Sequence, residues 1–363
     1  MINLSRDFLN NSHFNSSYVS YIKGKIKSTT LDINHSFFGN FQSIKIDNDF
    51  LNFLLIDPFS NFNKIKDDNL REFINVYLCV MNYLLKGKPY FDYLKIKNKY
   101  NPKRNEIYKN ERLSLINSFN ISCLYKINTS AKNNEKDYML YYNKIKDEFK
   151  ILNIDISKKI LYKYIDQEKR VSILNKINSP ICPYCNRQYI DYYKDYEGDE
   201  KIIAQLDHFY PKGVFPLFSL TLANFVPSCA YCNSILKRNY LFPLNYPFGY
   251  SNNDTKIFLL DDLSYINYYT VDNVKIRLND KHEFYDQLIF FNVDCIYKNH
   301  TPEIINWLNR KKLFSNSYKK SLEQVLKRNI SNDELKEILF DFNNKDDLSK
   351  ISLGKLKKDI LDF

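Results

Sequence analysis

Two CxxC pairs at the centre of the chain constrain its fold more than any other sequence feature. They are Cys182-Pro-Tyr-Cys185 and Cys229-Ala-Tyr-Cys232, and 44 positions separate Cys185 from Cys229. Each pair can aim two thiolates at one point, so the two pairs together supply the four sulfurs of a tetrahedral zinc site. A redox-active pair would explain one motif and leave the other unexplained. We therefore expect a closed, structural zinc site.

The other three cysteines do not form such pairs. Cys79 lies in an apolar stretch with helical spacing, whereas Cys123 and Cys295 lie among Phe, Ile and Tyr residues. The N-terminus lacks the basic and apolar pattern of a signal peptide, and no apolar run reaches the ~18 residues of a membrane span. We therefore expect a cytoplasmic protein that does not bind a membrane, in which these three cysteines are buried free thiols.

Between the CxxC pairs, the sequence predicts a strand, a loop, a second strand and a helix. Residues 202–206 form the expected first strand, which delivers Asp207 and His208. A loop with several prolines follows, then a short strand over 224–229 and a helix over 230–239. This order defines a ββα unit with one CxxC pair at each end.

Side-chain chemistry in this unit favours phosphodiester hydrolysis. Asp207 and His208 are adjacent on a strand, so one can face a metal and the other a substrate. Asp207 and Asn233 would leave several positions on Mg²⁺ open for water and phosphate oxygens. A neutral His208 could deprotonate water, and Asn224 could hold its imidazole in one tautomer. Lys237 lies four residues after Asn233, on the same expected helix face, and could pair with a flanking phosphate.

Two further basic residues, Lys212 and Arg238, are candidates for phosphate contacts, although ordinary exposed charges would explain them equally well. For the remaining histidines, the sequence predicts only where they lie. We place His13 and His35 on the surface, His282 in a turn, and His300 at the start of a helix.

The central motifs resemble those of HNH endonucleases of the ββα-metal class, in the variant whose last motif residue is Asn. This resemblance implies that Asp207 and Asn233 bind catalytic Mg²⁺ or Mn²⁺, that His208 is the general base and that Asn224 orients it. The spacing of Asn224 and Asn233 is similar to that in the HNH domains of RNA-guided CRISPR nucleases. The matching segments are Cys-Pro-Tyr-Cys-Asn-Arg (182–187), Leu-Asp-His-Phe-Tyr-Pro-Lys (206–212) and Asn-Phe-Val-Pro-Ser-Cys-Ala-Tyr-Cys-Asn-Ser-Ile-Leu-Lys (224–237).

A narrower resemblance extends beyond these motifs. The helix-rich sequence before Cys182 and the segments 294–300 and 353–359 look like the HNH nuclease subunit of Septu-type bacterial anti-phage systems. This resemblance implies an ABC/SMC-like ATPase partner, sometimes accompanied by a retron. Residues 1–110 lie outside it.

The net charge of +11 comes from the N-terminal half. Residues 1–181 carry 29 Lys and Arg against 18 Asp and Glu, whereas the remainder of the chain is balanced. The segment 86–112 holds nine basic and three acidic residues with tyrosines interleaved. Such a segment can attract phosphates and stack on unpaired bases, although a solvated surface is the simpler alternative. The chain contains neither a P-loop nor a GxGxxG motif, which excludes the common phosphate-binding loops.

The flanking regions contain several expected elements. Helical patterns cover 68–86, 137–149 and 158–177, whereas 128–134 is polar and loop-like. After the central unit, strands are expected at 256–260, 274–278 and 288–293. Thr301 and Pro302 open a helix, and Ser331 with Glu334 forms a capping box for another.

The sequence therefore predicts an α+β chain with three regions. A basic, mainly helical region spans 1–180, an HNH nuclease core with a zinc site spans 181–242, and an α+β, mostly helical region spans 243–363. The expected function is metal-dependent cleavage of nucleic acid, with DNA favoured, as the effector subunit of a bacterial anti-phage complex. Alternatives are an RNA- or tRNA-cleaving HNH effector and a catalytically silent, zinc-stapled module that binds nucleic acid or a partner.

Overall fold

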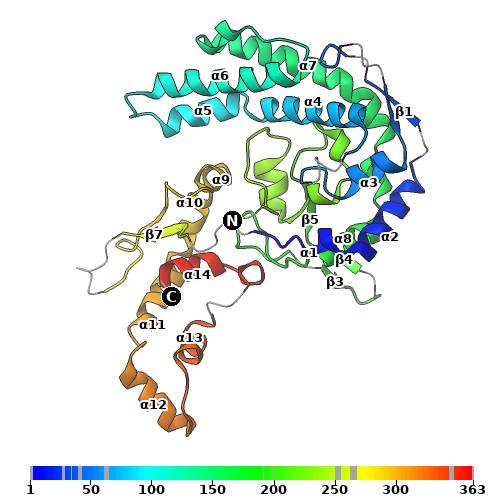
Figure 1. The fold of residues 1–363 in the computed structure, drawn as a ribbon. Coiled ribbons are helices and arrows are strands. Elements are labelled where there is room, and N and C mark those ends of the chain that lie inside the picture. The colour runs from blue at the N-terminus through cyan, green and yellow to red at the C-terminus, as the bar shows by residue number, and fades with distance from the viewer. Residues whose placement is uncertain are drawn as a thin grey trace.

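The computed structural model is a mixed α+β chain in which helices dominate (Figure 1). The described strands form four two-stranded antiparallel sheets, so the α+β class is confirmed. None of the described helices has both the length and the apolar character needed to cross a bilayer. The structure describes residues 3–26, 29–33, 35–39, 43–60, 65–190, 192–198, 200–249, 255–261, 268–342 and 347–361.

The N-terminal half is mainly helical, and α4, α5, α6 and α7 run side by side at the top of Figure 1. The predicted helix at 68–86 is confirmed as α4. Asp67 caps it, because its side chain accepts a hydrogen bond from the backbone N–H of Leu70 at 2.8 Å. The helix predicted at 137–149 is longer than expected. The bounds are α1 (Asp7–Asn10), α2 (Ser12–Lys23), β1 (Thr29–Asp32), β2 (Ser43–Ile46), α3 (Asn48–Ile56), α4 (Asp68–Leu85), α5 (Lys88–Lys97), α6 (Arg104–Ser122), η2 (Thr129–Lys132), α7 (Glu135–Lys159), η3 (Tyr162–Tyr164) and α8 (Gln167–Ile177).

The expected single helix over 158–177 is divided among three elements, namely the end of α7, η3 and α8. The first residues of this range end α7, and the chain then turns through the 3-10 helix η3. α8 begins directly after Asp166, whose side chain accepts from the backbone N–H of Lys169 at 2.9 Å. Asp166 is a strong N-cap, which explains why a new helix starts there. The turn through η3 lets Tyr162 face the central unit.

The central segment contains the predicted order of strand, loop, strand and helix, with different bounds. The strand predicted over 202–206 is interrupted, so Ile202 ends β4 and Gln205 starts β5. The helix predicted over 230–239 is a seven-residue π-helix, η6, which ends where Arg238 has a positive φ of 47°. The bounds are β3 (Tyr192–Lys194), β4 (Glu200–Ile202), β5 (Gln205–His208), η4 (Pro216–Phe218), η5 (Leu222–Asn224), β6 (Phe225–Ser228) and η6 (Tyr231–Lys237).

The C-terminal region contains one short hairpin, β7–β8, and several helices, so the strands predicted near 256–260 and 274–278 are confirmed in shortened form. The strand predicted at 288–293 is wrong, because its first half ends α9, a turn follows, and Val293 starts α10. Leu288 and Phe291 are both fully buried there. A short apolar run fits a strand or a buried helix equally well. The bounds are β7 (Phe258–Leu260), β8 (Ile276–Leu278), α9 (Tyr285–Phe290), α10 (Val293–Tyr297), η7 (Lys298–His300), α11 (Thr301–Lys311), α12 (Asn316–Leu326), α13 (Asn332–Phe340), η8 (Leu348–Lys350) and α14 (Gly354–Leu361).

Two predicted helix starts in this region are confirmed. α11 begins at Thr301 with proline in its first turn. The Ser331 hydroxyl accepts from the backbone N–H of Glu334 at 3.0 Å and caps α13.

The burial predicted for Cys295 is wrong, because Cys295 is exposed on α10, and Cys79 of α4 is only partly buried. His35, which was predicted on the surface, is also partly buried, with 10% of its side chain exposed.

A continuous apolar core connects the three regions predicted from the sequence. It includes side chains from the N-terminal helices, the β5–β6 unit and the C-terminal helices. The long connection between β5 and β6 is held by hydrogen bonds from distant elements. Tyr18 donates to the carbonyl of Leu220 at 2.6 Å, and Asn153 donates to the carbonyl of Val214 at 3.0 Å. The N-terminal helices therefore support the loop that follows Asp207 and His208.

Candidate functional site

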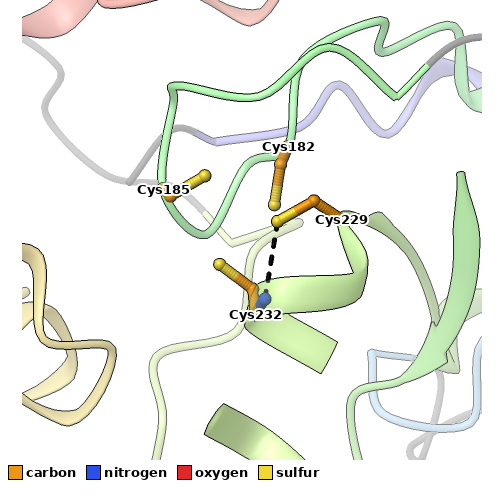
Figure 2. A group of neighbouring side chains, drawn as sticks. All are labelled: Cys182, Cys185, Cys229 and Cys232. Carbon is orange, nitrogen blue, oxygen red and sulfur yellow. Dashed lines mark hydrogen bonds between the residues drawn. The ribbon is translucent and has the colours of Figure 1, made fainter. Parts of the chain in front are cut away.

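The four cysteines of the two CxxC pairs converge on one point. Their sulfur atoms all lie within 4.8 Å of one another, and all four residues are buried. Figure 2 shows the sulfurs approaching from two segments, one around Cys182 and Cys185 and the other around Cys229 and Cys232. In the part of the chain that the structure describes, no second group of this kind is found. The chain therefore contains a buried four-cysteine site that can hold a metal ion such as zinc.

Local backbone geometry explains why the first pair can point inward. The N–H of Asn186 donates to the carbonyl of Cys182 at 2.7 Å, and the N–H of Cys182 donates to the carbonyl of Gln188 at 2.9 Å. Asn186 adopts a left-handed conformation (φ 48°), which Asn tolerates better than most residues. These contacts close a tight turn around the pair.

The cysteine side chains influence one another electrostatically. Hydrogen bonds from Cys182, and then from Cys229 and Cys232, hold the pKa of Cys185 well below the usual range of a thiol. The backbone N–H of Cys232 also donates to Sγ of Cys229 at 3.4 Å (Figure 2). Contacts with the other three cysteines raise the pKa of Cys232, and burial first of all raises the pKa of Cys182. A cation at the centre of the four sulfurs would favour the thiolate form of all four, which is the form that binds zinc.

The first CxxC turn is also fixed by the C-terminal region, which the sequence did not predict. The fully buried Asn186 side chain donates to the carbonyl of Leu348 at 3.0 Å and accepts from the N–H of Lys355 at 2.8 Å. The Tyr297 hydroxyl donates to the carbonyl of Cys185. The only local signal for this contact is a polar residue directly after the second cysteine of the pair.

The β5–β6 hairpin presents Asp207 and His208 to opposite sides. His208 pairs with Phe225 in the strand register, and Asp207 pairs with Val226. The Asp207 carboxylate accepts from the Tyr184 hydroxyl at 2.7 Å, and Tyr184 belongs to the first CxxC pair. His208 faces away from it, toward the 209–224 connection and η3.

The His208 ring is fixed by a backbone carbonyl. Its Nε2 lies 3.0 Å from the carbonyl oxygen of Ser219, which can only accept a hydrogen bond. Nε2 therefore carries the proton in the neutral ring, and Nδ1 is the basic nitrogen. Burial, together with the positive charges of Lys212, Lys237 and Arg170, lowers the pKa of His208 to about 3. The ring is neutral at pH 7.

Asn224 reaches His208 through the backbone rather than through the imidazole contact expected from the sequence. Its side-chain oxygen accepts from the N–H of Tyr210 at 2.8 Å, and its amide donates to the carbonyl of Phe218 at 2.9 Å. Phe218 directly precedes Ser219, whose carbonyl holds the ring. The β5–β6 connection folds back over the hairpin, so the carbonyl of Ser219 occupies the place expected for the Asn224 amide.

The residues predicted to bind Mg²⁺ have other partners. The Nζ atom of Lys237 lies 3.0 Å from Oδ1 of Asp207 and donates to the carbonyl of His208 at 2.6 Å. Asn233 donates to Oε1 of Gln205 at 3.0 Å. A divalent cation on Asp207 would meet the buried ammonium of Lys237 in a poorly screened environment. Asp207 and Asn233 therefore do not fit a Mg²⁺ or Mn²⁺ site in this conformation.

The three predicted phosphate contacts lie in different surroundings. Lys237 is buried in the ion pair with Asp207, whereas Arg238 is exposed and donates from Nε to the carbonyl of Ser234 at 3.3 Å. Lys212 lies near His208, with its ammonium 3.8 Å from the centre of the Tyr162 ring. Of the three, Lys212 is the one whose ammonium faces the Tyr162 ring, which in turn contacts the His208 ring.

Three of the nine basic residues in the segment 86–112 pair with carboxylates, and these pairs are partly exposed. Lys86 pairs with Glu111, Lys95 with Glu135 and Lys97 with Asp286, each at 2.7 Å. Arg112 in this segment is buried, and its Nε donates to the carbonyl of Lys132 at 2.7 Å. These contacts favour the interpretation that several of these residues join elements together.

Comparison of the chain with models of protein families, with curated proteins and with solved structures finds no match. The fold and the site define the chain as an α+β protein with a buried four-cysteine site able to hold a metal.

Proposed function

We propose that this chain is an HNH-type endonuclease that hydrolyses phosphodiester bonds of nucleic acid, with His208 as the general base. The observation that carries this proposal is the fixed orientation of the His208 ring. The Ser219 carbonyl holds Nε2–H, so Nδ1 is the proton acceptor. The sequence resemblance to HNH nucleases supports the same assignment.

In the proposed reaction, Nδ1 of His208 takes a proton from water as the water oxygen attacks phosphorus. The Ser219 carbonyl stabilises the resulting imidazolium because it accepts the Nε2–H bond. A bound phosphate also favours the protonated ring, since its negative charge offsets the cations that lower the pKa of His208. The bond from phosphorus to the leaving sugar oxygen then breaks, that oxygen takes a proton from solvent water, and His208 releases its own proton to solvent.

The four-cysteine site has a structural role in this proposal. Four cysteine ligands leave no open position for substrate, so zinc held there would join the two CxxC segments and support β5 and η6. Tyr184 links that site directly to Asp207. Zinc would therefore influence catalysis indirectly, by fixing the position of the β5–β6 hairpin.

A second candidate is cleavage of RNA by its own 2′-hydroxyl. The observation that favours it is the buried pair of Lys237 and Asp207, which occupies the expected position of the catalytic metal. RNA carries its nucleophile within the substrate, so a neutral imidazole and nearby cations are sufficient for a proton-transfer mechanism. The candidate substrates for this site therefore include RNA as well as DNA.

The anti-phage role and the ATPase partner remain part of the proposal and rest on the narrower resemblance. In the structure, both resembling segments, 294–300 and 353–359, lie beside the first CxxC turn. Tyr297 contacts Cys185, and Lys355 contacts Asn186. Co-purification of the chain with an ATPase subunit would test the partnership.

The deciding experiment incubates the full chain with single- and double-stranded DNA and RNA, with Mg²⁺, with Mn²⁺ and with EDTA. We expect His208→Ala to abolish cleavage and His282→Ala, a matched buried histidine outside the site, to retain it. Equal cleavage by wild type and His208→Ala, or none by wild type on any substrate, contradicts the proposal.

Two further measurements belong to the same experiment. Product ends separate the two candidates, because attack by the 2′-hydroxyl leaves a 2′,3′-cyclic phosphate whereas water does not. Zinc content is measured in every sample, so that EDTA damage to the four-cysteine site is not mistaken for removal of a catalytic ion.

A further inference from the structure

Two cations flank the tyrosine that touches His208. The ammonium of Lys212 lies 3.8 Å from the centre of the Tyr162 ring, and Cζ of Arg170 lies 5.0 Å from the same centre. The Tyr162 ring meets the His208 ring edge-on, with 4.7 Å between centroids. Lys212 follows β5, whereas Arg170 and Tyr162 come from α8 and η3. Two separate elements thus place positive charge on the tyrosine that contacts the proposed base.

Neither cation has an acidic partner among the described residues. Other basic side chains pair with carboxylates, such as Lys86 with Glu111, but Arg170 and Lys212 form no ion pair with a described residue. Nε of Arg170 is buried without a hydrogen-bond partner. A buried donor without a partner is costly, so this arrangement favours a bound anion.

The two cations also act on each other. Burial first, and then the nearby charge of Arg170, lower the pKa of Lys212. Two like charges held together without a counter-charge repel, and an anion between them would relieve that repulsion. The Tyr162 ring holds both by cation–π contacts, so the pair is positioned before a ligand arrives.

We propose that Arg170 and Lys212 form a phosphate-binding site that places a phosphodiester of the nucleic acid against Nδ1 of His208. This inference rests on the proposed function and adds Arg170, which lies outside the β5–β6 unit, to its binding residues. A guanidinium can donate to two oxygens of one phosphate, and an ammonium adds a point charge. This geometry suits a phosphate of the nucleic-acid backbone and does not distinguish one base from another.

The surface next to Lys212 can accept the neighbouring phosphates. A hollow of about 580 Å³ adjoins it and is lined by Lys146 and Lys150 of α7, with Asp147 as the acidic side chain among its lining residues. Lys146 and Lys150 are exposed, so both can reach a strand that passes along α7. The strand would then enter between α7 and the loop that carries Lys212.

The test measures binding separately from cleavage. Fluorescence anisotropy of a labelled single-stranded oligonucleotide is recorded with the full chain carrying His208→Ala, so that nothing is cut. We expect Arg170→Gln and Lys212→Gln each to weaken binding about tenfold and to reduce the salt dependence by about one released ion. Lys176→Gln, an exposed lysine near the other end of α8, should change binding less than twofold, and Arg170→Lys should restore part of it.

The results distinguish this inference from the proposed function. Unchanged binding in the Arg170→Gln, Lys212→Gln double variant, with zinc content and melting temperature preserved, overturns the phosphate site even if the wild type cleaves nucleic acid. Weaker binding in both single variants supports the site even if no cleavage is found. If Arg170→Gln lowers the melting temperature, Arg170→Lys provides the decisive comparison, because it keeps the charge and the helix. Binding by Arg170→Lys as weak as by Arg170→Gln, with both folded, contradicts the site.

Discussion

The ammonium of Lys237 lies 3.0 Å from Oδ1 of Asp207, and the two side chains are only 1% and 4% exposed. A buried pair of this kind is costly to break, because the remaining charge cannot reach water. The pair connects η6 to β5, and it ties the helix that carries Cys232 to the strand that carries His208. It therefore constrains both the fold and any metal that the hairpin could bind.

Lys237→Met is expected to destabilise the protein by about 3 kcal/mol, since it leaves the Asp207 carboxylate buried without its cation. The free energy of unfolding in urea measures this change. Asp207→Asn combined with Lys237→Met should recover part of the loss. Lys159→Met, which breaks the more exposed pair with Asp155, should cost less than 1 kcal/mol. Equal losses in the two single variants would show that burial does not decide the strength of the pair.

The same variant tests whether Lys237 competes with a divalent ion. Removal of the ammonium leaves the Asp207 carboxylate free to bind Mg²⁺, so millimolar Mg²⁺ should raise the melting temperature of Lys237→Met more than that of the wild type. Calorimetric titration measures binding directly. A wild type that binds Mg²⁺ as tightly as Lys237→Met would contradict the competition.

Removal of one thiolate from the four-cysteine site should release the metal. Cys229→Ser is expected to lose most of the bound zinc and to melt at a clearly lower temperature, because zinc binding contributes to folding. Elemental analysis and thermal melting measure the two effects. Cys295→Ser is the matched control, since Cys295 is exposed and lies outside the site. Full zinc content in Cys229→Ser would mean that the four sulfurs do not bind the ion together.

The sequence predicted the four-cysteine site well because each CxxC pair encodes its own geometry over four residues. The positions of Asp207 and His208 on a strand were predictable for the same reason, since alternation along a strand is local. The secondary structure of residues 288–293 was not predictable, because an apolar run of this length has no periodicity that separates a strand from a helix.

The contacts that complete the site could not be predicted, because they come from distant elements. Arg170 and Tyr162 lie on α8 and η3, and no spacing in the sequence relates them to His208. Ser219 acts through its backbone carbonyl, which any residue type supplies. The surroundings of Asp207 depend on how η6 packs, and this placed Lys237 where a metal was expected.

Asn186 joins the first CxxC turn to the C-terminal region, so its removal should weaken metal retention. Asn186→Ala loses hydrogen bonds to Leu348 and Lys355 and strains the left-handed backbone, for an expected loss of about 2–4 kcal/mol. Asn186→Gly keeps that backbone conformation and loses only the side chain. Both should release zinc to a coloured chelator faster than the wild type, with Asn186→Ala the faster.

The control for this comparison is Asn233→Ala, which removes a half-buried amide from the second CxxC segment. It should release zinc at close to the wild-type rate. If Asn186→Gly and the wild type release zinc equally fast, the C-terminal contacts do not hold the site.

The buried His208 should make the fold sensitive to acid. Its pKa is lowered to about 3 in the folded protein, whereas an unfolded histidine has a pKa of about 6.5. As the pH falls below 6.5, His208 binds a proton in the unfolded chain but not in the folded chain, so the free energy of unfolding falls. At pH 5 this contribution amounts to about 2 kcal/mol. His208→Asn removes it, so urea unfolding should show a smaller loss of stability between pH 7 and pH 5 in this variant than in the wild type. His13→Asn, which changes an exposed histidine, should behave like the wild type. An identical pH dependence in all three proteins would mean that His208 is protonated in the folded state near pH 6, and therefore that it is open to solvent.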